Sequence, residues 1–163
     1  MAKYAWAVVG IGFIIIAGAL YLVWSPAAAP NPADNLPIID PSQQGQPTYN
    51  NATPDLIIVQ LPFPGAVVGR EFSVRGMARG YWFFEASFPV FLFDPDGNEI
   101  AVGIAQPEPA GTEWMTENMI GFKADLQVPA TYSGPATLVV RNDNPSGLPE
   151  NDKSVSFPIT VEY

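Results

Sequence analysis

The chain has 163 residues, which is enough for one modest domain and an appendage. It contains neither cysteine nor histidine, which excludes disulfide bonds, thiolate metal sites and Ser–His or Cys–His nucleophile pairs. Its formal net charge of −9 argues against nucleic acid as a partner, because binding to phosphates needs clustered lysine and arginine. We therefore expect a fold held together by hydrophobic burial alone, with no cofactor.

An uncharged run from Tyr4 to Trp24 follows a short start at residues 1–3. At about 1.5 Å per residue this run covers roughly 30 Å, the thickness of the hydrocarbon core of a bilayer. Lys3 places the short start in the cytoplasm by the positive-inside bias. We predict that residues 4–24 form a transmembrane helix, which anchors the chain in the cell membrane by a single pass and leaves the C-terminal part extracytoplasmic.

A cleaved signal peptide is the main alternative, because Ala27–Ala29 offer a small-residue cleavage pattern. The apolar run is longer than the usual core of about 7–15 residues, and a proline would directly follow the cut. A type IV pilin helix is a further alternative, but the acidic residue that such subunits carry near the start of the helix is missing. We favour an uncleaved anchor.

Residues 25–54 contain seven prolines in thirty residues and few apolar side chains. This composition predicts an extended linker, at most about 3.1 Å long per residue, that holds the following domain away from the membrane. Asn51-Ala52-Thr53 matches the glycosylation acceptor pattern, although such triplets are also common by chance.

Residues 55–163 show short segments in which apolar and polar side chains alternate, separated by Gly, Pro, Asn and Asp. Such alternation is typical of half-buried strands. It is clearest in Ile120–Val128, and it recurs at Ile100, Val102 and Ile104. About seven segments of this kind, with no helical period among them, predict an all-β, immunoglobulin-like antiparallel β-sandwich.

The stretch from Gly80 to Phe93, GYWFFEASFPVFLF, is rich in aromatic residues. It is too short to span about 30 Å as a helix, and an extended chain would place alternate side chains on opposite faces. One of these faces is wholly apolar, from Trp82 through Phe88 to Leu92. We predict a long strand, or two strands kinked at Pro89, with the apolar face in the core.

The opposite face of this stretch is mixed. Its aromatic residues are the candidate interaction surface of the domain: Tyr81, Phe83, Phe91 and Phe93. Glu85 lies on the same face, and it is either solvated or paired with Arg75 or Arg79, because an unpaired buried charge costs several kcal/mol. We expect a structural ion pair here rather than a catalytic acid.

Two acidic loops are weak calcium candidates, because hard carboxylate oxygens are the ligands that calcium prefers. The first is DPDGNE at 94–99, with Asp94 and Asp96 around a glycine. Asp-Gly between two strands is also a strong hairpin signal, and we favour the plain hairpin. The second loop, 141–153, holds Asp143, Glu150 and Asp152, and we favour a structured surface loop there.

Three segments of the sequence are distinctive: LPFPGAVVG at 61–69, VRGMARGYWFFEASFPVFLFDPDGNEIA at 74–101 and NPSGLPENDKSVSFPITV at 144–161. They resemble the immunoglobulin-like domain of bacterial spore germination proteins, which is often found beside the GerMN domain. With the strand pattern, the resemblance covers about Leu56–Val161. It implies a non-catalytic extracytoplasmic module that supports interactions at the cell envelope, with a link to germination or sporulation through the family.

These observations lead to one hypothesis and three alternatives. We expect a binding or scaffolding module of the bacterial cell envelope, with a protein or the cell wall as its partner. A wall-glycan binder would expose Trp114 and Tyr132, whose rings could stack on sugars. A calcium-stabilised adhesin would use the acidic loops. An envelope hydrolase is disfavoured, because histidine, cysteine and a recognisable nucleophile motif are all missing.

Overall fold

The structure of the protein is a computed structural model that describes residues 45–163. The predicted anchor at 4–24 and most of the predicted linker lie outside these described residues. Within residues 45–163, no helix has the length and apolar character needed to cross a membrane. The two helices labelled in this region are single 3₁₀ turns, η3 at Gly80–Trp82 and η4 at Pro149–Asn151.

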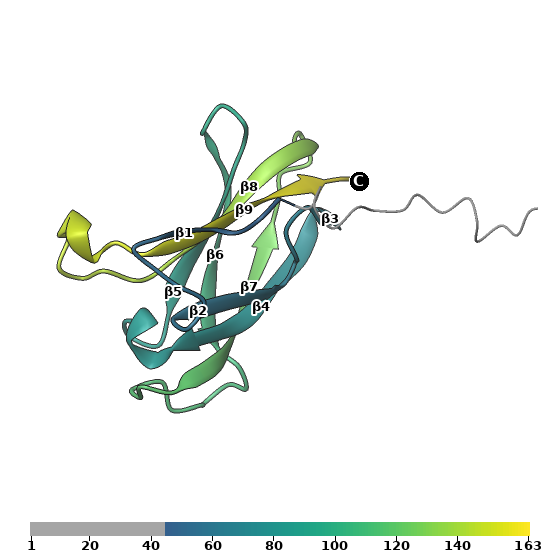
Figure 1. Ribbon diagram of the computed structural model, residues 1–163. Helices are drawn as coiled ribbons and strands as arrows, with labels where there is room; N and C mark the ends of the chain where they lie inside the picture. Colours follow the sequence, from purple (N-terminus) through teal and green to yellow (C-terminus); the bar gives the residue numbers. More distant parts are fainter. Residues whose placement is uncertain (1–44) are drawn as a thin grey trace, which may run out of the picture. The chain divides into compact units, whose positions relative to one another are not determined.

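The described domain is all-β, as predicted (Figure 1). Its nine strands are β1 Thr48–Asn50, β2 Ile57–Leu61, β3 Val67–Val68, β4 Glu71–Arg79, β5 Phe88–Phe93, β6 Glu99–Pro107, β7 Met119–Gln127, β8 Gly134–Arg141 and β9 Ser154–Val161. About seven strands were expected, and the difference is the two very short strands β1 and β3. All pairings are antiparallel except that of β3 with β9.

The strands form one curled sheet in the order β1-β9-β8-β5-β6-β7-β4-β2, with β3 also on β9. Strand β6 joins the two halves of the curl. Its first part pairs with β5, whereas Gln106 and Pro107 pair with Lys123 and Phe122 of β7. We call the β1, β3, β9, β8, β5 half sheet A, together with the first part of β6, and the β7, β4, β2 half sheet B. The core lies between them, as expected for an immunoglobulin-like sandwich.

Gly103 is the residue that lets β6 pass close to β7 at this crossover. A Cβ atom at this position would lie 2.7 Å from the backbone oxygen of Asp125 and 3.0 Å from the side chain of Leu126. Real Cβ atoms do not approach backbone oxygen so closely, so any larger residue would push the two strands apart.

The centre of the core is a cluster of aromatic rings around Phe88. The Phe88 ring meets Phe83 at 4.8 Å, Phe122 at 5.0 Å and Trp82 at 6.5 Å between centroids, and all three contacts are edge-to-face. This is the geometry that the aromatic quadrupole favours. The cluster draws on both sheets, and it joins them without the disulfide that such sandwiches often contain.

The aromatic stretch 80–93 forms a strand only in its second half. Residues 80–82 form η3, and Glu85 and Ala86 adopt left-handed backbone angles, with φ of 49° and 60°. These residues make a tight turn, in which Phe84 and Ser87 exchange backbone hydrogen bonds of 3.0 and 3.1 Å. The expectation of a long strand was therefore wrong for 80–87, because the turn interrupts the alternation of faces.

Strand β1 lies inside the range that the sequence predicted as linker. It pairs with Ser154–Ser156 of β9, and β3 pairs with Thr160 and Val161 along the same edge. An uncovered edge strand exposes unpaired backbone groups and invites aggregation. Residues 48–50 thus cover an edge of sheet A, so the folded domain begins before residue 55.

We expect Gly103→Ala to lower the free energy of unfolding by about 1–3 kcal/mol, the usual cost of overpacking a close contact. Urea denaturation of a fragment of residues 45–163 would measure the change. Gly69→Ala is the matched control, because nothing lies within 4 Å of its Cβ position. Equal stability of the two variants would show that the crossover does not need glycine.

Candidate functional site

The outer face of sheet A carries exposed apolar side chains. Phe91 of β5 lies between Val102 of β6 and Val139 of β8, and Pro89 pairs with Ile104. Val102 and Ile104 are 50% and 57% exposed. We call this surface the sheet A face and define it by six residues: Pro89, Phe91, Phe93, Val102, Ile104 and Val139.

The sheet A face is almost free of charge. Residues 45–163 hold six basic and fourteen acidic side chains, yet only Glu99 and Arg141 fall within the strands of sheet A. The Arg141 guanidinium lies over the ring of Phe91 at 5.1 Å, which is within the range of a cation–π contact. An acidic domain thus presents one face of apolar side chains, with Glu99 and Arg141 at its margin.

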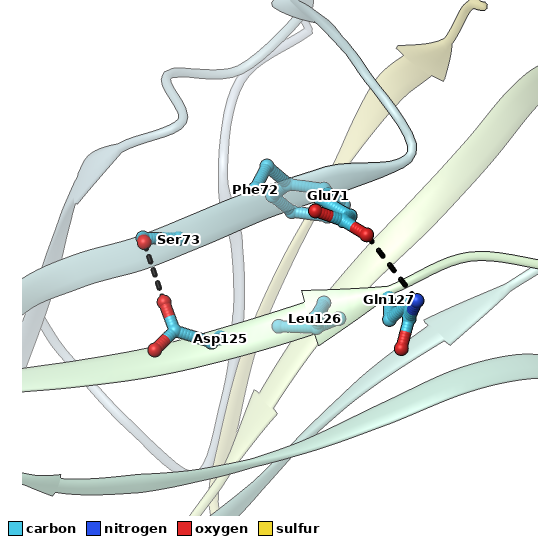
Figure 2. Close-up of a pocket in the computed structure, with 6 residues that line it drawn as sticks. All are labelled: Glu71, Phe72, Ser73, Asp125, Leu126 and Gln127. Carbon is cyan, nitrogen blue, oxygen red and sulfur yellow. Dashed lines mark hydrogen bonds between the residues drawn. The ribbon is translucent and has the colours of Figure 1, made fainter.

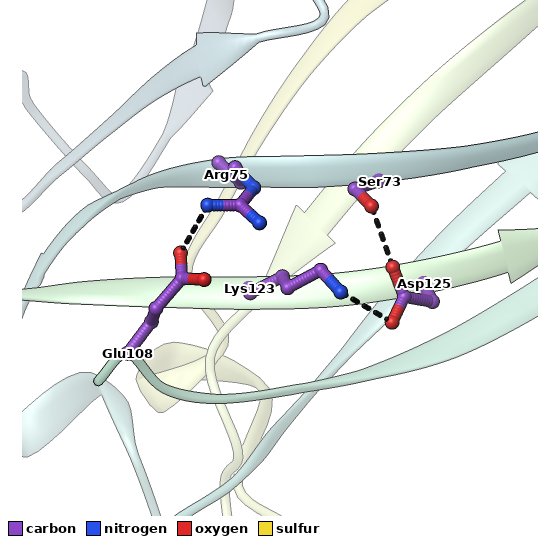
Figure 3. Close-up of polar contacts among 5 residues, drawn as sticks. All are labelled: Ser73, Arg75, Glu108, Lys123 and Asp125. Carbon is purple, nitrogen blue, oxygen red and sulfur yellow. Dashed lines mark hydrogen bonds and ion pairs between the residues drawn. The ribbon is translucent and has the colours of Figure 1, made fainter. Parts of the chain in front are cut away.

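The outer face of sheet B is charged instead (Figure 3). Arg75 forms an ion pair with Glu108 at 2.8 Å, and Lys123 forms one with Asp125 at 2.8 Å. Ser73 also donates a hydrogen bond of 2.6 Å to Asp125. The hydrogen bonds from Lys123 and then Ser73 lower the pKa of Asp125. The polar groups of this face therefore satisfy one another.

A shallow hollow on sheet B contains two carboxylates, Glu71 and Asp125 (Figure 2). Both residues are exposed, and each accepts a hydrogen bond from a residue of the other strand, at 3.3 Å from Gln127 and at 2.6 Å from Ser73. A glycosidase would hold such a pair on either side of a bound sugar, with the pKa of one acid raised. The hydrogen bonds from Lys123 and Ser73 lower the pKa of Asp125, whereas the general acid of such a pair needs a raised pKa.

The four aromatic residues predicted as an interaction surface lie in three different places. Phe91 and Phe93 are neighbours on the sheet A face, with ring centroids 5.9 Å apart. Tyr81 is 54% exposed in η3, away from that face, whereas Phe83 is only 4% exposed. The expectation for Phe83 was wrong, because the turn at 84–87 breaks the alternation and leaves Phe83 packed against Phe88.

The expected ion pair of Glu85 does not form in the described domain. Arg75 pairs with Glu108 instead. Arg79 donates its hydrogen bonds to the backbone oxygens of Asp55 and Glu117, at 2.8 and 2.9 Å. Glu85 is exposed in the tight turn, so its charge is solvated and needs no partner.

Asp94 closes the hairpin between β5 and β6. Its carboxylate accepts hydrogen bonds from the backbone N–H groups of Asp96 and Asn98, at 2.9 and 2.8 Å, and from the Asn98 side chain at 2.9 Å. Gly97 supplies the positive φ of 85° that the turn requires. The Asn98 side-chain bond, followed by the backbone bonds, lowers the pKa of Asp94 below its ordinary value of 3.8. The Asp94 carboxylate thus stabilises the turn through these hydrogen bonds.

The second acidic loop is held by amides. Asn144 donates a hydrogen bond of 2.8 Å to Asp152, and the Asn142 side chain bridges Asn151 and Lys153. Glu150 is exposed. Within residues 45–163, no three acidic side chains lie close enough together to hold a metal ion. Neither this loop, with Asp143, nor Asp94 and Asp96 gathers a calcium ligand set.

Trp114 and Tyr132, the residues on which a glycan binder would depend, are both half-buried against the core. The Tyr132 hydroxyl donates a hydrogen bond to the backbone oxygen of Pro135. Burial, together with the charges of Asp94 and Asp96, raises the pKa of Tyr132. The Tyr132 hydroxyl is therefore tied to the start of β8, whereas Trp114 lines two surface hollows.

The alternation of large and small residues in β6 is a sequence signal for the sheet A face. Ile100, Val102 and Ile104 alternate with small residues, and the small ones, Ala101 and Gly103, face the core.

The model of one protein family, the immunoglobulin-like domain of bacterial spore germination, matches residues 56–148. This chain belongs to that family. Comparison with curated proteins and with solved structures found no match.

The matched residues of the germination immunoglobulin-like domain include all of β2–β8, and with them every residue of the sheet A face. The resemblance seen in the sequence is thereby confirmed. Strand β9 follows the matched region, and its pairing with β8 from Gly134 to Arg141 places it in the same sheet.

Asp94→Ala should lower the melting temperature of the fragment of residues 45–163 at pH 7, because three hydrogen bonds to the turn are lost. A lowered folded-state pKa stabilises the fold above the unfolded value, and this stabilisation is lost as the pH falls. The difference between wild type and variant should therefore shrink below about pH 4. Asp96→Ala removes the same charge from the same turn, and we expect little change. A melting-temperature difference between wild type and Asp94→Ala that persists at low pH would show that the charged Asp94 carboxylate does not stabilise the turn.

Calcium should leave the melting temperature unchanged. The acidic loops use their carboxylates and amides on one another, and no ligand set is assembled in the described domain. Scanning calorimetry with millimolar calcium and with a chelator would measure this, with magnesium as the control. A rise specific to calcium would instead restore the adhesin hypothesis.

Proposed function

We propose that this member of the germination immunoglobulin-like family is a membrane-anchored binding module, which holds an envelope protein on its sheet A face. Residues 4–24 would anchor the chain in the membrane, and the proline-rich segment after them would act as a spacer. The domain would then lie outside the cytoplasm. The uncharged run and the seven prolines that follow it support this arrangement.

The observation that carries the proposal is the apolar sheet A face of an otherwise acidic domain. Fully burying a valine or isoleucine side chain stabilises a complex by about 1.5–3 kcal/mol. Val102 and Ile104 each leave half of their surface in water, and Phe91 and Val139 adjoin them. Contiguous apolar surface of this kind is typical of protein–protein interaction sites.

The composition of the sheet A face fits a protein partner better than a charged one. Its centre offers aliphatic and aromatic contacts, and at its margin the Arg141 guanidinium, which lies over the Phe91 ring, can donate to a carboxylate or a backbone oxygen of a partner. Interface cores are depleted in charge and enriched in aromatic residues and arginine. The proposed role is scaffolding without catalysis, and family membership supports a link to germination.

A wall glycan is the second candidate partner, because the ring of Trp114 keeps an open side beside two surface hollows. Sugars stack on such rings. Trp114 and Tyr132 are both half-buried, which leaves less ring surface for stacking than this function would need.

Two isoleucines provide a matched test of the sheet A face. Ile104 lies on β6, at the margin of sheet A, and Ile58 lies on β2, at the margin of sheet B, and both are exposed. We expect Ile104→Glu in the tagged full-length chain to abolish capture of an envelope protein from cross-linked membranes of the source organism. Ile58→Glu should leave that capture intact, as quantified by mass spectrometry.

Circular dichroism of both variants would confirm that each is folded. Capture that survives Ile104→Glu, or that both variants lose equally, would exclude the sheet A face as the binding surface. Sedimentation with stripped cell wall and capture of no protein would favour the glycan function.

A further inference from the structure

A second surface lies where three loops of the sandwich meet. These are the β4–β5 loop at 80–87, the β6–β7 loop at 108–118 and the β8–β9 loop at 142–153. The backbone N–H of Asp143 donates a hydrogen bond of 3.2 Å to the oxygen of Trp82, which joins two of them. Arg79 holds the third by its bond to the Glu117 oxygen. We call this surface the loop end.

Gly80 shows how tightly the first two loops pack. A Cβ atom at this position would lie 2.0 Å from the backbone oxygen of Thr116 and 2.2 Å from that of Trp114. No residue larger than glycine fits there. The β4–β5 and β6–β7 loops therefore pack closely against each other, and the position of Trp114 depends on the β4–β5 loop.

The loop end lies at the opposite end of the domain from the C-terminus. Gly45 lies against Pro158, and from there β1 runs antiparallel to β9, from the partner of Ser156 to the partner of Ser154. It thus runs toward the β8–β9 loop. Figure 1 shows the C-terminus at the far end of the domain from that loop.

Trp114 and Met115 separate two hollows at the loop end. One, of about 410 Å³, is lined by Tyr81, Thr116 and Glu117 besides these two. The other, of about 420 Å³, is lined by the same two residues together with Ala86, the end of β6 and residues 110–113 of the β6–β7 loop. Met115 is 72% exposed and Tyr81 is 54% exposed. We call these two adjoining hollows, which share Trp114 and Met115, the Trp114 groove.

The charge beside the Trp114 groove has one sign. Loops 80–87 and 108–118 contain four glutamates, Glu85, Glu108, Glu113 and Glu117, and no lysine or arginine. Glu108 is neutralised by Arg75, and the Glu113 carboxylate accepts a hydrogen bond of 2.9 Å from the Met115 N–H. Arg79 is the nearest cation in sequence, and its guanidinium is engaged with two backbone oxygens. Glu85 and Glu117 have no ion-pair partner in the described domain.

We propose that the Trp114 groove binds an extended basic peptide segment of a partner protein, at a surface separate from the sheet A face. A guanidinium or ammonium group is attracted to the faces of aromatic rings such as Tyr81 and Trp114. The Glu117 carboxylate lines the same hollow and complements that charge. Met115 adapts its shape to different neighbours. The acidic domain as a whole increases the rate at which a cationic segment arrives.

A neutral glycan would use the aromatic rings of this groove but would gain nothing from the carboxylates. This difference allows a test by fluorescence anisotropy on the full-length chain in detergent micelles. The probe is a labelled octapeptide in which arginine alternates with serine. Its control contains citrulline, which keeps the shape of arginine and removes the charge. We expect only the arginine peptide to bind, with an affinity that falls as salt increases.

Two substitutions locate the site. Glu117→Gln and Tyr81→Ala should each weaken arginine-peptide binding about two- to fivefold, the usual effect of an exposed ion pair or cation–π contact. Glu162→Gln is the matched control, because it removes one exposed carboxylate at the other end of the domain. It should change the affinity little.

Three results would overturn the proposal. Equal binding of the citrulline peptide would exclude a charge-specific site. An equal loss in Glu162→Gln and Glu117→Gln would show diffuse attraction only. Binding of soluble cell-wall fragments that Tyr81→Ala abolishes and Glu117→Gln leaves intact would assign the groove to glycan. Ile104→Glu should bind the arginine peptide normally. The proposal for the sheet A face and the proposal for the Trp114 groove can therefore be rejected independently of each other.

Discussion

The close passage of β6 across β7 is the constraint on which the rest of this domain depends. Where Gly103 meets the backbone of Asp125, one sheet folds over on itself and encloses a core. The inner side of β6 then has room only for alanine and glycine at this crossover, so its larger side chains face outward. The apolar sheet A face is a consequence of this geometry, since Val102 and Ile104 occupy the side of the strand that has space.

The aromatic core links this crossover to the loop end. The Phe88 ring of β5 contacts the rings of Trp82 and Phe83, and it also contacts Phe122 of β7, so it joins the two sheets. The same 3₁₀ turn that buries Trp82 leaves Tyr81 exposed and presses Gly80 against the β6–β7 loop. Core packing and the shape of the Trp114 groove therefore depend on one short segment, which makes the groove part of the folded structure.

Family membership describes the fold of this domain, and the two surfaces describe what it offers a partner. The sheet A face is apolar, whereas the Trp114 groove is aromatic and bordered by glutamates. Surfaces of such different chemistry suit different segments of a partner or two different partners, which is the arrangement expected of a scaffold. Strand β1 pairs with β9, so residues 48–50 are part of sheet A.

Local sequence determined the features that depend on neighbouring residues. The alternation in Ile120–Val128 predicted β7, and Asp94 with Gly97 predicted the hairpin, because turn chemistry and strand period act over a few residues. Tertiary structure decided the rest. Whether Ile104 faces the core depends on the space that β7 leaves, the burial of Phe83 depends on a turn stabilised by packing, and the partner of Arg75 comes from a distant loop. These outcomes are set by contacts between residues far apart in the chain, which period and composition do not encode.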